Sequence, residues 1–306
     1  MTTMLGKHFL SIDQLGETEL AALLAEARRL KADLTPGRGS LAGQTVALVF
    51  QKPSLRTRVS FEVAATQLGA TVLYLSPAEV GLGEREDVAD VARVLSRYVN
   101  AIVARTFLHE HVEALAKYAT VPVINGLSDR SHPCQILGDL LTMEEHLGQV
   151  HGLTVAYVGD GNNVARSLVE AAPRAGFTLR LACPEGYEPD LDAVEDAQEM
   201  RAGCVVVGHD PAAAVDRADV IYTDVWFSMG EEGEREARAA IFPPYQVTEA
   251  LVAQASPQAI VMHCLPAHRG EEITDGAIEG PHSVVFDQAE NRLHAQRALL
   301  FSLLAS

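Results

Sequence analysis

The chain alternates short apolar runs with segments of helical spacing, and this alternation limits its possible folds more than any other feature. The first run, TVALVF at residues 45–50, is rich in β-branched residues, and apolar residues recur every three or four positions soon after it. Similar runs follow at residues 71–75, 101–104, 121–124, 154–158, 178–182, 204–207, 220–223 and 259–262. Strands that alternate with helices favour parallel sheets with helices on both faces. The sequence therefore predicts an α/β fold.

The series of strands and helices restarts once, which predicts two domains. A chain of 306 residues with 48% hydrophobic residues is long enough to bury two cores. A helix predicted at 133–146 ends shortly before the restart. We predict two doubly wound domains, each with a central parallel sheet flanked by helices, at residues 1–147 and 148–288. The C-terminal helix, 289–306, is expected to pack back on the first domain.

Three further expectations concern local structure in the first domain. The leucine and alanine spacing predicts one helix over residues 12–33. A long loop at 76–86 contains Gly81 and Gly83 and is expected to be mobile, and residues 125–132 read as a polar turn.

Residues 50–69 (FQKPSLRTRVSFEVAATQLG) predict the end of a strand, a tight loop and a helix. Four polar residues lie at this corner: Ser54, Arg56, Thr57 and Arg58. Hydroxyls, guanidinium groups and the N–H groups of a helix N-terminus together suit a phosphate. Residues two apart on a helix do not share a face, so we assign Arg56 to the anion and expect Arg58 to pair with a protein carboxylate. The alternative is a helix cap flanked by solvated arginines.

Three more polar residues of the first domain follow predicted strands, where the ligands of parallel sheets gather. Arg105 ends the strand at 101–104, and Pro133 opens a helix that would present His132 and Gln135 near its N-terminus. A histidine can donate a hydrogen bond to a carbonyl oxygen, and a glutamine can donate and accept. Purely structural roles remain the alternative for all three residues.

In the second domain, polar residues follow the strands at 154–158 and 220–223. Asp224 could bind an ammonium group or could only cap a turn, and the amides of Asn162 and Asn163 suit a carboxylate. Gly159 and Gly161 would begin a dinucleotide fingerprint, but its third glycine position is occupied by Val164. An NAD-dependent oxidoreductase is therefore a disfavoured alternative.

Cys264 follows the last predicted strand, directly after His263. A covalent mechanism with Cys264 as nucleophile and His263 as base is possible, but adjacent residues seldom point at each other, so we favour contacts to ligand.

The four cysteines show no zinc or redox spacing, and we expect no metal and no cofactor. A net charge of −17 argues against nucleic acid and anionic membranes as partners. No apolar leader or long apolar span is visible, so we expect a cytoplasmic protein with free thiols.

These motifs, in this order and spacing, resemble the ornithine carbamoyltransferases over essentially the whole chain. The resemblance rests on four stretches: SLRTR at 54–58, HPCQ at 132–135, DVWFSMG at 224–230 and HCLP at 263–266. The broader superfamily includes aspartate carbamoyltransferases, and the third and fourth stretches resemble the ornithine branch.

The resemblance implies a first domain that binds carbamoyl phosphate, a second that binds ornithine, and a homotrimer or a multiple of one. The side-chain amine of ornithine would attack the carbamoyl carbon directly, through a tetrahedral intermediate. Carbamoyl phosphate would meet Ser54, Leu55, Arg56, Thr57, Arg105, His132, Gln135, Cys264, Leu265 and Arg292. Ornithine would meet Asn163, Asp224, Ser228 and Met229. The catalytic residues would be Arg56, Arg105, His132, Asp224 and Cys264.

The chain departs from the family pattern at two places. Leu55 stands where threonine is common, and the loop around Gly81 has glycine where a polar residue is frequent. Putrescine or an acylated ornithine as acceptor, and a non-catalytic regulatory relative, stay open as alternatives.

Overall fold

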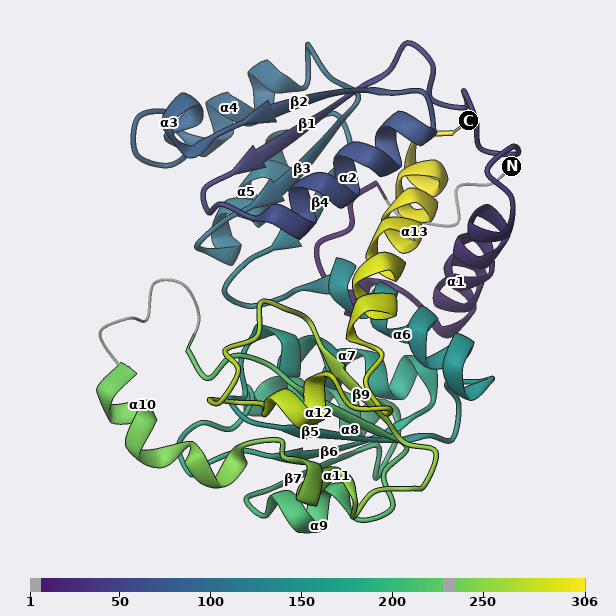
Figure 1. The fold of residues 1–306 in the computed structure, drawn as a ribbon. Coiled ribbons are helices and arrows are strands. Elements are labelled where there is room, and N and C mark those ends of the chain that lie inside the picture. The colour runs from purple at the N-terminus through teal and green to yellow at the C-terminus, as the bar shows by residue number, and fades with distance from the viewer. Residues whose placement is uncertain (1–6, 228–234, 306) are drawn as a thin grey trace. The chain divides into compact units, whose positions relative to one another are not determined.

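The computed structural model describes residues 7–227 and 235–305, and it divides into two compact units. The first unit comprises residues 1–141 and 290–306, and the second comprises residues 142–289. Each unit is built on its own sheet of parallel strands (Figure 1). The predicted α/β class, with two parallel sheets flanked by helices, is confirmed.

The sheet of the first unit has the strand order β2-β1-β3-β4. Its strands are β1 (Thr45–Phe50), β2 (Thr71–Leu75), β3 (Ala101–Arg105) and β4 (Val123–Leu127). Its helices are α1 (Glu17–Ala32), α2 (Leu55–Gln67), α3 (Pro77–Val80), α4 (Val88–Leu95), α5 (His109–Tyr118), α6 (Pro133–Leu147) and α13 (Val285–Leu304), of which α6 and α13 continue into the second unit.

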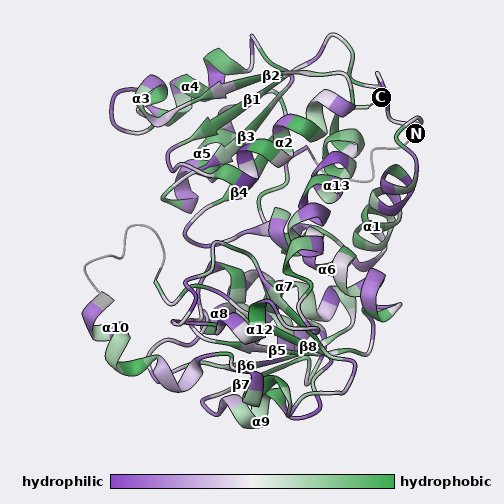
Figure 2. Cartoon of the chain, viewed as in Figure 1, coloured by the Kyte–Doolittle hydropathy of each residue, from purple (hydrophilic) through white to green (hydrophobic). Residues whose placement is uncertain are grey.

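Helices cover both faces of this sheet, because the chain adds strands first on one side of β1 and then on the other. The crossover from β1 to β2 runs opposite to those that lead to β3 and β4, and right-handed crossovers then place α2 on one face and α4 and α5 on the other. Ala47 and Val49 of β1 are fully buried in a cluster with Val91 of α4 and Leu115 of α5. Figure 2 shows hydrophobic residues concentrated along β1 and β3.

Three local predictions for this unit need correction. The predicted first helix is interrupted: a short 3-10 helix (Ile12–Gln14) precedes α1, whose N-cap is Gly16. The predicted loop at 76–86 contains the single turn α3, because Ser76 and Glu79 form a capping box. Strand β4 begins and ends later than predicted, and it ends later because Asn125 and Leu127 pair with β3 instead of forming a turn.

The second unit has the strand order β7-β6-β5-β8-β9. Its strands are β5 (Thr154–Val158), β6 (Thr178–Ala182), β7 (Val205–Gly208), β8 (Val220–Thr223) and β9 (Ile260–His263). Its helices are α7 (Asn163–Ala175), α8 (Leu191–Met200), α9 (Pro211–Val215), α10 (Arg235–Ile241), α11 (Glu249–Val252) and α12 (Asp275–Ile278), with a further 3-10 helix at Pro243–Tyr245.

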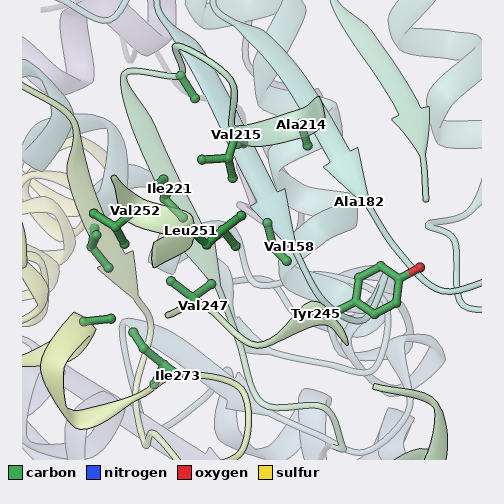
Figure 3. Close-up of a cluster of buried hydrophobic side chains, with 14 of the residues drawn as sticks. Val158, Ala182, Ala214, Val215, Ile221, Tyr245, Val247, Leu251, Val252 and Ile273 are labelled. Carbon is green, nitrogen blue, oxygen red and sulfur yellow. The ribbon is translucent and has the colours of Figure 1, made fainter. Parts of the chain in front are cut away.

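One face of this sheet packs against a core of aliphatic side chains from short helices and loops. Val158 and Ile221 of the central strands contact Val215 of α9 and Leu251 of α11 in a single buried cluster (Figure 3). On the central strand, Val155, Ala156, Tyr157 and Val158 are all fully buried, which accounts for the continuous apolar run in the sequence.

Candidate active site

The strand order creates one reversal point in each sheet, and the candidate residues lie at these two points. In the first unit the reversal falls between β1 and β3, whose last residues, Phe50 and Arg105, are paired in register. In the second unit it falls between β5 and β8. Crevices outside the carboxyl ends of strands at such points are where open α/β sheets bind ligands.

Helix α2 begins at the reversal point of the first unit and presents its N-terminus there. Ser54 is the N-cap, and its Oγ accepts a hydrogen bond of 3.2 Å from the backbone N–H of Thr57. Ser54 therefore caps the helix, as the alternative interpretation of the sequence predicted. The cap does not exclude a ligand, because the remaining N–H groups of the first turn and the positive end of the helix dipole lie beside it.

The hydroxyl of Thr57 joins two arginines that are far apart in the sequence. Thr57 is fully buried, and its Oγ1 accepts from Arg292 Nη2 at 2.7 Å and from Arg105 Nη1 at 3.5 Å. Both guanidinium groups are themselves buried. Positive charge is thereby concentrated next to the N-terminus of α2, an arrangement that favours an anion.

His132 lies among these guanidinium groups. It is almost completely buried, and its pKa is lowered well below 6.5, first by burial and then by the charges of Arg292, Arg105 and Arg56. The imidazole is therefore neutral near pH 7. A neutral imidazole has one N–H to donate, and it can stabilise an oxygen that gains negative charge.

Helices α6 and α13 hold this group of residues in place. A Cβ atom on Gly138 would lie 3.1–3.3 Å from the backbone of Arg292, closer than ordinary contact, so a larger residue here would require one of the two helices to shift. Gln135, fully buried on α6, donates from Nε2 to Asp139 Oδ1 at 2.8 Å. Burial raises the pKa of Cys134 in the same motif to about 12, which makes it a structural thiol whose Sγ contacts the Asn125 carbonyl.

The two remaining residues of the SLRTR motif point elsewhere. Arg58 is exposed, lies 3.6 Å from a carboxylate oxygen of Glu62 and has its guanidinium 3.8 Å from the ring centroid of Tyr74. Its predicted pairing with a protein carboxylate is confirmed. The Leu55 side chain is 74% exposed, so in this structure the residue offers its backbone to the corner and little else.

At the reversal point of the second unit, Asp224 is a buried carboxylate with three donors. Its Oδ2 accepts from Asn162 Nδ2 at 2.9 Å, and its Oδ1 accepts from the backbone N–H of Val225 at 2.8 Å and from Cys264 Sγ at 2.9 Å. Asn162 also caps α7, because its Oδ1 accepts from Val164 and Ala165. These contacts fix the orientation of the carboxylate, which suits an ammonium group.

His263, the residue before Cys264, is held by hydrogen bonds that direct its ring nitrogens away from the Cys264 thiol. His263 Nδ1 accepts the backbone N–H of Leu265 at 2.9 Å, and its Nε2 lies 3.0 Å from Oε1 of the fully buried Glu272. Both ring nitrogens are thus engaged away from the thiol. Leu265 has a φ of 57°, a left-handed conformation that is costly for leucine and is found mostly at functional sites.

The structure groups most of the predicted residues into two sets. The first set lies in the first unit and consists of Arg56, Thr57, Arg105, His132 and Arg292. Ser54 and Gln135 lie near the N-termini of α2 and α6 in the same unit. The second set lies in the second unit and consists of Asp224 and Cys264. Asn163 is the first residue of α7, next to the Asn162 that reaches Asp224. Ser228 and Met229 lie outside the described residues.

Three residues near these sets were not selected from the sequence. Asn162 was considered together with Asn163 as an amide that suits a carboxylate, but only Asn163 was carried into the predicted ornithine set. Glu272 is the second of two adjacent glutamates, a pattern that does not separate a buried carboxylate from an exposed one. Lys52, in the loop before α2, is buried, and its Nζ lies 4.8 Å from the ring centroid of Phe107. Its position in the sequence, just before the SLRTR motif, was the only feature that could have marked it as a candidate.

Gly161, the second glycine of the incomplete dinucleotide fingerprint, has a packing role. A Cβ on Gly161 would lie 2.3 Å from the backbone at Glu188 and Pro189, and its N–H donates to the Tyr187 carbonyl at 2.8 Å. Gly161 is therefore needed for the close approach of residues 187–189.

Two groups of side chains among the described residues have the donor atoms of a metal site. In the first, Asp224, His263 and Cys264, both imidazole nitrogens are already engaged, so the set does not fit an ion. The second, His268, Glu271 and Glu272, lies apart from the residues discussed above and is considered below.

The fold and these two sets of residues define an α/β protein with one site suited to an anion and another suited to a cation. Two family models match the chain. Residues 7–145 match the carbamoyl phosphate-binding domain of aspartate/ornithine carbamoyltransferases, and residues 151–303 match their aspartate/ornithine-binding domain. The chain belongs to the aspartate/ornithine carbamoyltransferase family.

Individual relatives point to the ornithine branch. The chain is 52% identical to the ornithine carbamoyltransferase of Anoxybacillus flavithermus over 304 residues, which is 98% of this chain and 97% of the relative. It is 52% identical over 305 residues to an anabolic ornithine carbamoyltransferase of Pyrococcus furiosus, with the same coverage. The solved structure of an ornithine carbamoyltransferase from P. furiosus matches with a TM-score of 0.95, 51% identity and 99% coverage of both chains. The resemblance stated from the sequence is confirmed.

Proposed function

We propose that this chain transfers the carbamoyl group of carbamoyl phosphate to the side-chain amine of L-ornithine, which yields L-citrulline and phosphate. The observation that carries the proposal is the grouping of Arg56, Arg105 and Arg292 around a neutral His132 at the N-terminus of α2. Family membership and the names of the relatives point to the same reaction.

The phosphate of the donor is assigned to the N-terminus of α2. Arg56 and the hydroxyl and backbone groups of Ser54 and Thr57 would hold its oxygens, and Leu55 would contribute its backbone N–H. Charge-assisted hydrogen bonds of this kind strengthen as the leaving phosphate gains charge, so they favour departure as well as binding.

The carbamoyl oxygen is assigned to Arg105 and His132. Attack on the carbonyl carbon converts this oxygen into an anion, and a guanidinium together with a neutral N–H donor stabilises that anion. Arg292 would contribute its charge to the same group, and Gln135 would contact the carbamoyl amide. The backbone and thiol of Cys264 with Leu265 are the remaining contacts that we assign to carbamoyl phosphate.

The amino acid is assigned to the second unit. Asp224 would bind the α-ammonium group of ornithine, because its carboxylate is buried and already oriented by Asn162 and Cys264. Asn163 would bind the α-carboxylate. Ser228 and Met229 complete the proposed set and lie outside the described residues.

The chemical step is a direct displacement. The neutral side-chain nitrogen of ornithine forms a bond to the carbamoyl carbon, and the bond from that carbon to the phosphate oxygen then breaks. The nitrogen loses one proton, for which the departing phosphate is the acceptor. Ornithine must reach carbamoyl phosphate for this step.

The proposal is tested by assaying the purified chain for citrulline and phosphate with carbamoyl phosphate and a panel of acceptors. The panel contains L-ornithine, putrescine, an Nα-acylated ornithine and L-aspartate. We expect stoichiometric citrulline and phosphate with ornithine, at a kcat/KM at least tenfold above that with any other acceptor. Asp224→Asn should raise the KM for ornithine far more than the KM for carbamoyl phosphate, because it removes the charge opposite the ammonium.

Preference for putrescine or the acylated ornithine would show that the acceptor is assigned wrongly. Turnover of none of the four acceptors by a correctly folded chain would refute the transferase proposal and favour a regulatory relative. The exposed carboxylate Asp196, changed to Asn, is the matched control and should leave both KM values unchanged.

We further propose that the chain works as a homotrimer in the cytoplasm, in the biosynthetic direction. Leu55, Val59 and Val63 are exposed apolar residues four positions apart on α2, which supports a subunit contact on this helix. A relative carries the word anabolic in its name, which supports the direction. None of the helices within the described ranges is long and apolar enough to cross a membrane. Light scattering of the purified chain checks the trimer.

A further inference from the structure

A second polar cluster lies in the segment after β9, outside the residues assigned to substrates. It consists of His268, Glu271 and Glu272, and their Nδ1 and carboxylate oxygen atoms all lie within 4.8 Å of one another. His268 Nδ1 is 3.7 Å from Glu271 Oε2 and 4.0 Å from Glu272 Oε2. These distances are too long for direct hydrogen bonds.

The second oxygen of Glu272 is a buried acceptor that the described residues leave without a donor. The side chain of Glu272 is 0% exposed, and its Oε2 has no hydrogen-bond partner among the described residues. A buried carboxylate oxygen without a donor is costly, and a second carboxylate beside it adds repulsion. A cation within the cluster would remove both penalties.

The cluster is also held in position by its surroundings. Glu272 Oε1 accepts from His263 Nε2 at 3.0 Å and from the backbone N–H of His268 at 2.6 Å, which orients Oε2 toward the cluster. The imidazole of His268 stacks on Phe227, with ring centroids 5.4 Å apart. His268 and Glu271 are partly exposed, so an ion can enter and leave from solvent.

We propose that His268, Glu271 and Glu272 form a binding site for a divalent first-row transition-metal ion. Bonds of about 2.0–2.2 Å to one ion place two ligand atoms about 3.0–4.4 Å apart, a range that includes both distances from His268. One imidazole with two carboxylates suits Zn²⁺, Co²⁺ or Mn²⁺ better than Ca²⁺ or Mg²⁺, which prefer oxygen donors alone.

The site connects to the substrate residues through one side chain. Glu272 offers one oxygen to the ion and the other to His263, whose Nδ1 holds the backbone N–H of Leu265. An ion bound by Glu272 therefore stabilises the strained turn at Leu265 without taking part in carbamoyl transfer. The inference depends on the geometry of the cluster and is independent of the proposed function.

Binding is measured on the full chain after treatment with a chelator, by calorimetric titration with Zn²⁺ and by absorption with Co²⁺. We expect one saturable site at which the cobalt spectrum lacks the intense thiolate charge-transfer band. That band would instead place the ion on Cys264 and overturn the proposal, as would a lack of binding.

Variants identify the ligands. His268→Ala and Glu271→Gln should each weaken Zn²⁺ about 10- to 100-fold or more, because each removes a direct ligand from a site where even outer contacts have effects of that size. Both residues are partly exposed, so the variants should fold. The exposed residues His151 and Glu195, changed to Ala and Gln, are matched controls and should leave the affinity unchanged. Equal affinity in all four variants would refute the assignment.

Discussion

Arg292 donates a hydrogen bond of 2.7 Å from Nη2 to the hydroxyl of Thr57, across 235 positions of the sequence. The contact brings the C-terminal helix α13 to the first turn of α2, where Arg105 donates to the same hydroxyl. A single buried threonine thus sets the spacing of two guanidinium groups. The position of α13 is therefore as important to the anion site as the SLRTR motif itself.

Gly138→Ala tests whether the packing of α13 on α6 positions Arg292. In a free helix this change stabilises by about 1 kcal/mol. Here the added Cβ would lie 3.1–3.3 Å from the Arg292 backbone, so we expect a net loss of about 1–3 kcal/mol in the free energy of unfolding and a lower kcat. Urea unfolding and steady-state kinetics measure the two effects. A variant more stable than the parent, with full turnover, would show that α13 adjusts freely.

The two arginines of the SLRTR motif should respond differently to substitution. Arg56→Ala removes a guanidinium assigned to phosphate and should lower kcat/KM at least ~100-fold, about 3 kcal/mol of transition-state stabilisation. Arg58→Ala is the matched control: it removes an exposed ion pair and a ring contact, so activity should change less than about threefold. Similar losses in the two variants would contradict the division of roles.

Burial and three guanidinium groups lower the pKa of His132, and this shift has a consequence for stability. Between the lowered pKa and 6.5, the unfolded chain binds a proton at this position that the folded chain does not. The contribution is fully present above pH 6.5 and is lost as the pH falls below it, with a slope of up to about 1.4 kcal/mol per pH unit.

His132→Gln should therefore flatten the dependence of the free energy of unfolding on pH below 6.5, relative to the parent. Urea unfolding at a series of pH values measures the slope. His8 and His294 also have lowered pKa values and contribute in both proteins, so the difference between the two slopes isolates His132. The exposed His151, changed to Gln, is the control. An unchanged slope in His132→Gln would mean that the imidazole is protonated in the folded state.

Cys264 should form no covalent intermediate. Its thiol donates to the Asp224 carboxylate, and both nitrogens of the neighbouring His263 are engaged with Leu265 and Glu272, so this histidine is not placed to act as a base for the thiol. Incubation with carbamoyl phosphate alone, followed by intact-protein mass spectrometry, should show no added carbamoyl mass. Cys264→Ser keeps a donor to Asp224 and should retain measurable turnover. An adduct that disappears on addition of ornithine would establish a covalent route.

Local patterns predicted much of the fold and part of the candidate site. Apolar runs located the strands to within about one residue, except β4, where pairing of Asn125 with Ala104 of β3 overrides the polar character of residues 125–127. The start of α2 followed from Ser54 and the spacing after it. The pairing of Arg58 with a protein carboxylate was predicted because Arg56 and Arg58 do not share a helix face, and the structure identifies Glu62, one turn further along, as the partner.

The sequence by itself determined the alternation of strands and helices, the polar residues at the strand ends and the resemblance to a family, because these depend on spacing over a few residues. Only the tertiary structure decided that Thr57 meets Arg292, that Asn162 donates to Asp224, and that Glu272 is buried while its neighbour Glu271 is partly exposed. The physical reason is that these contacts depend on which faces of distant elements pack together, and burial then determines the pKa of a group such as His132.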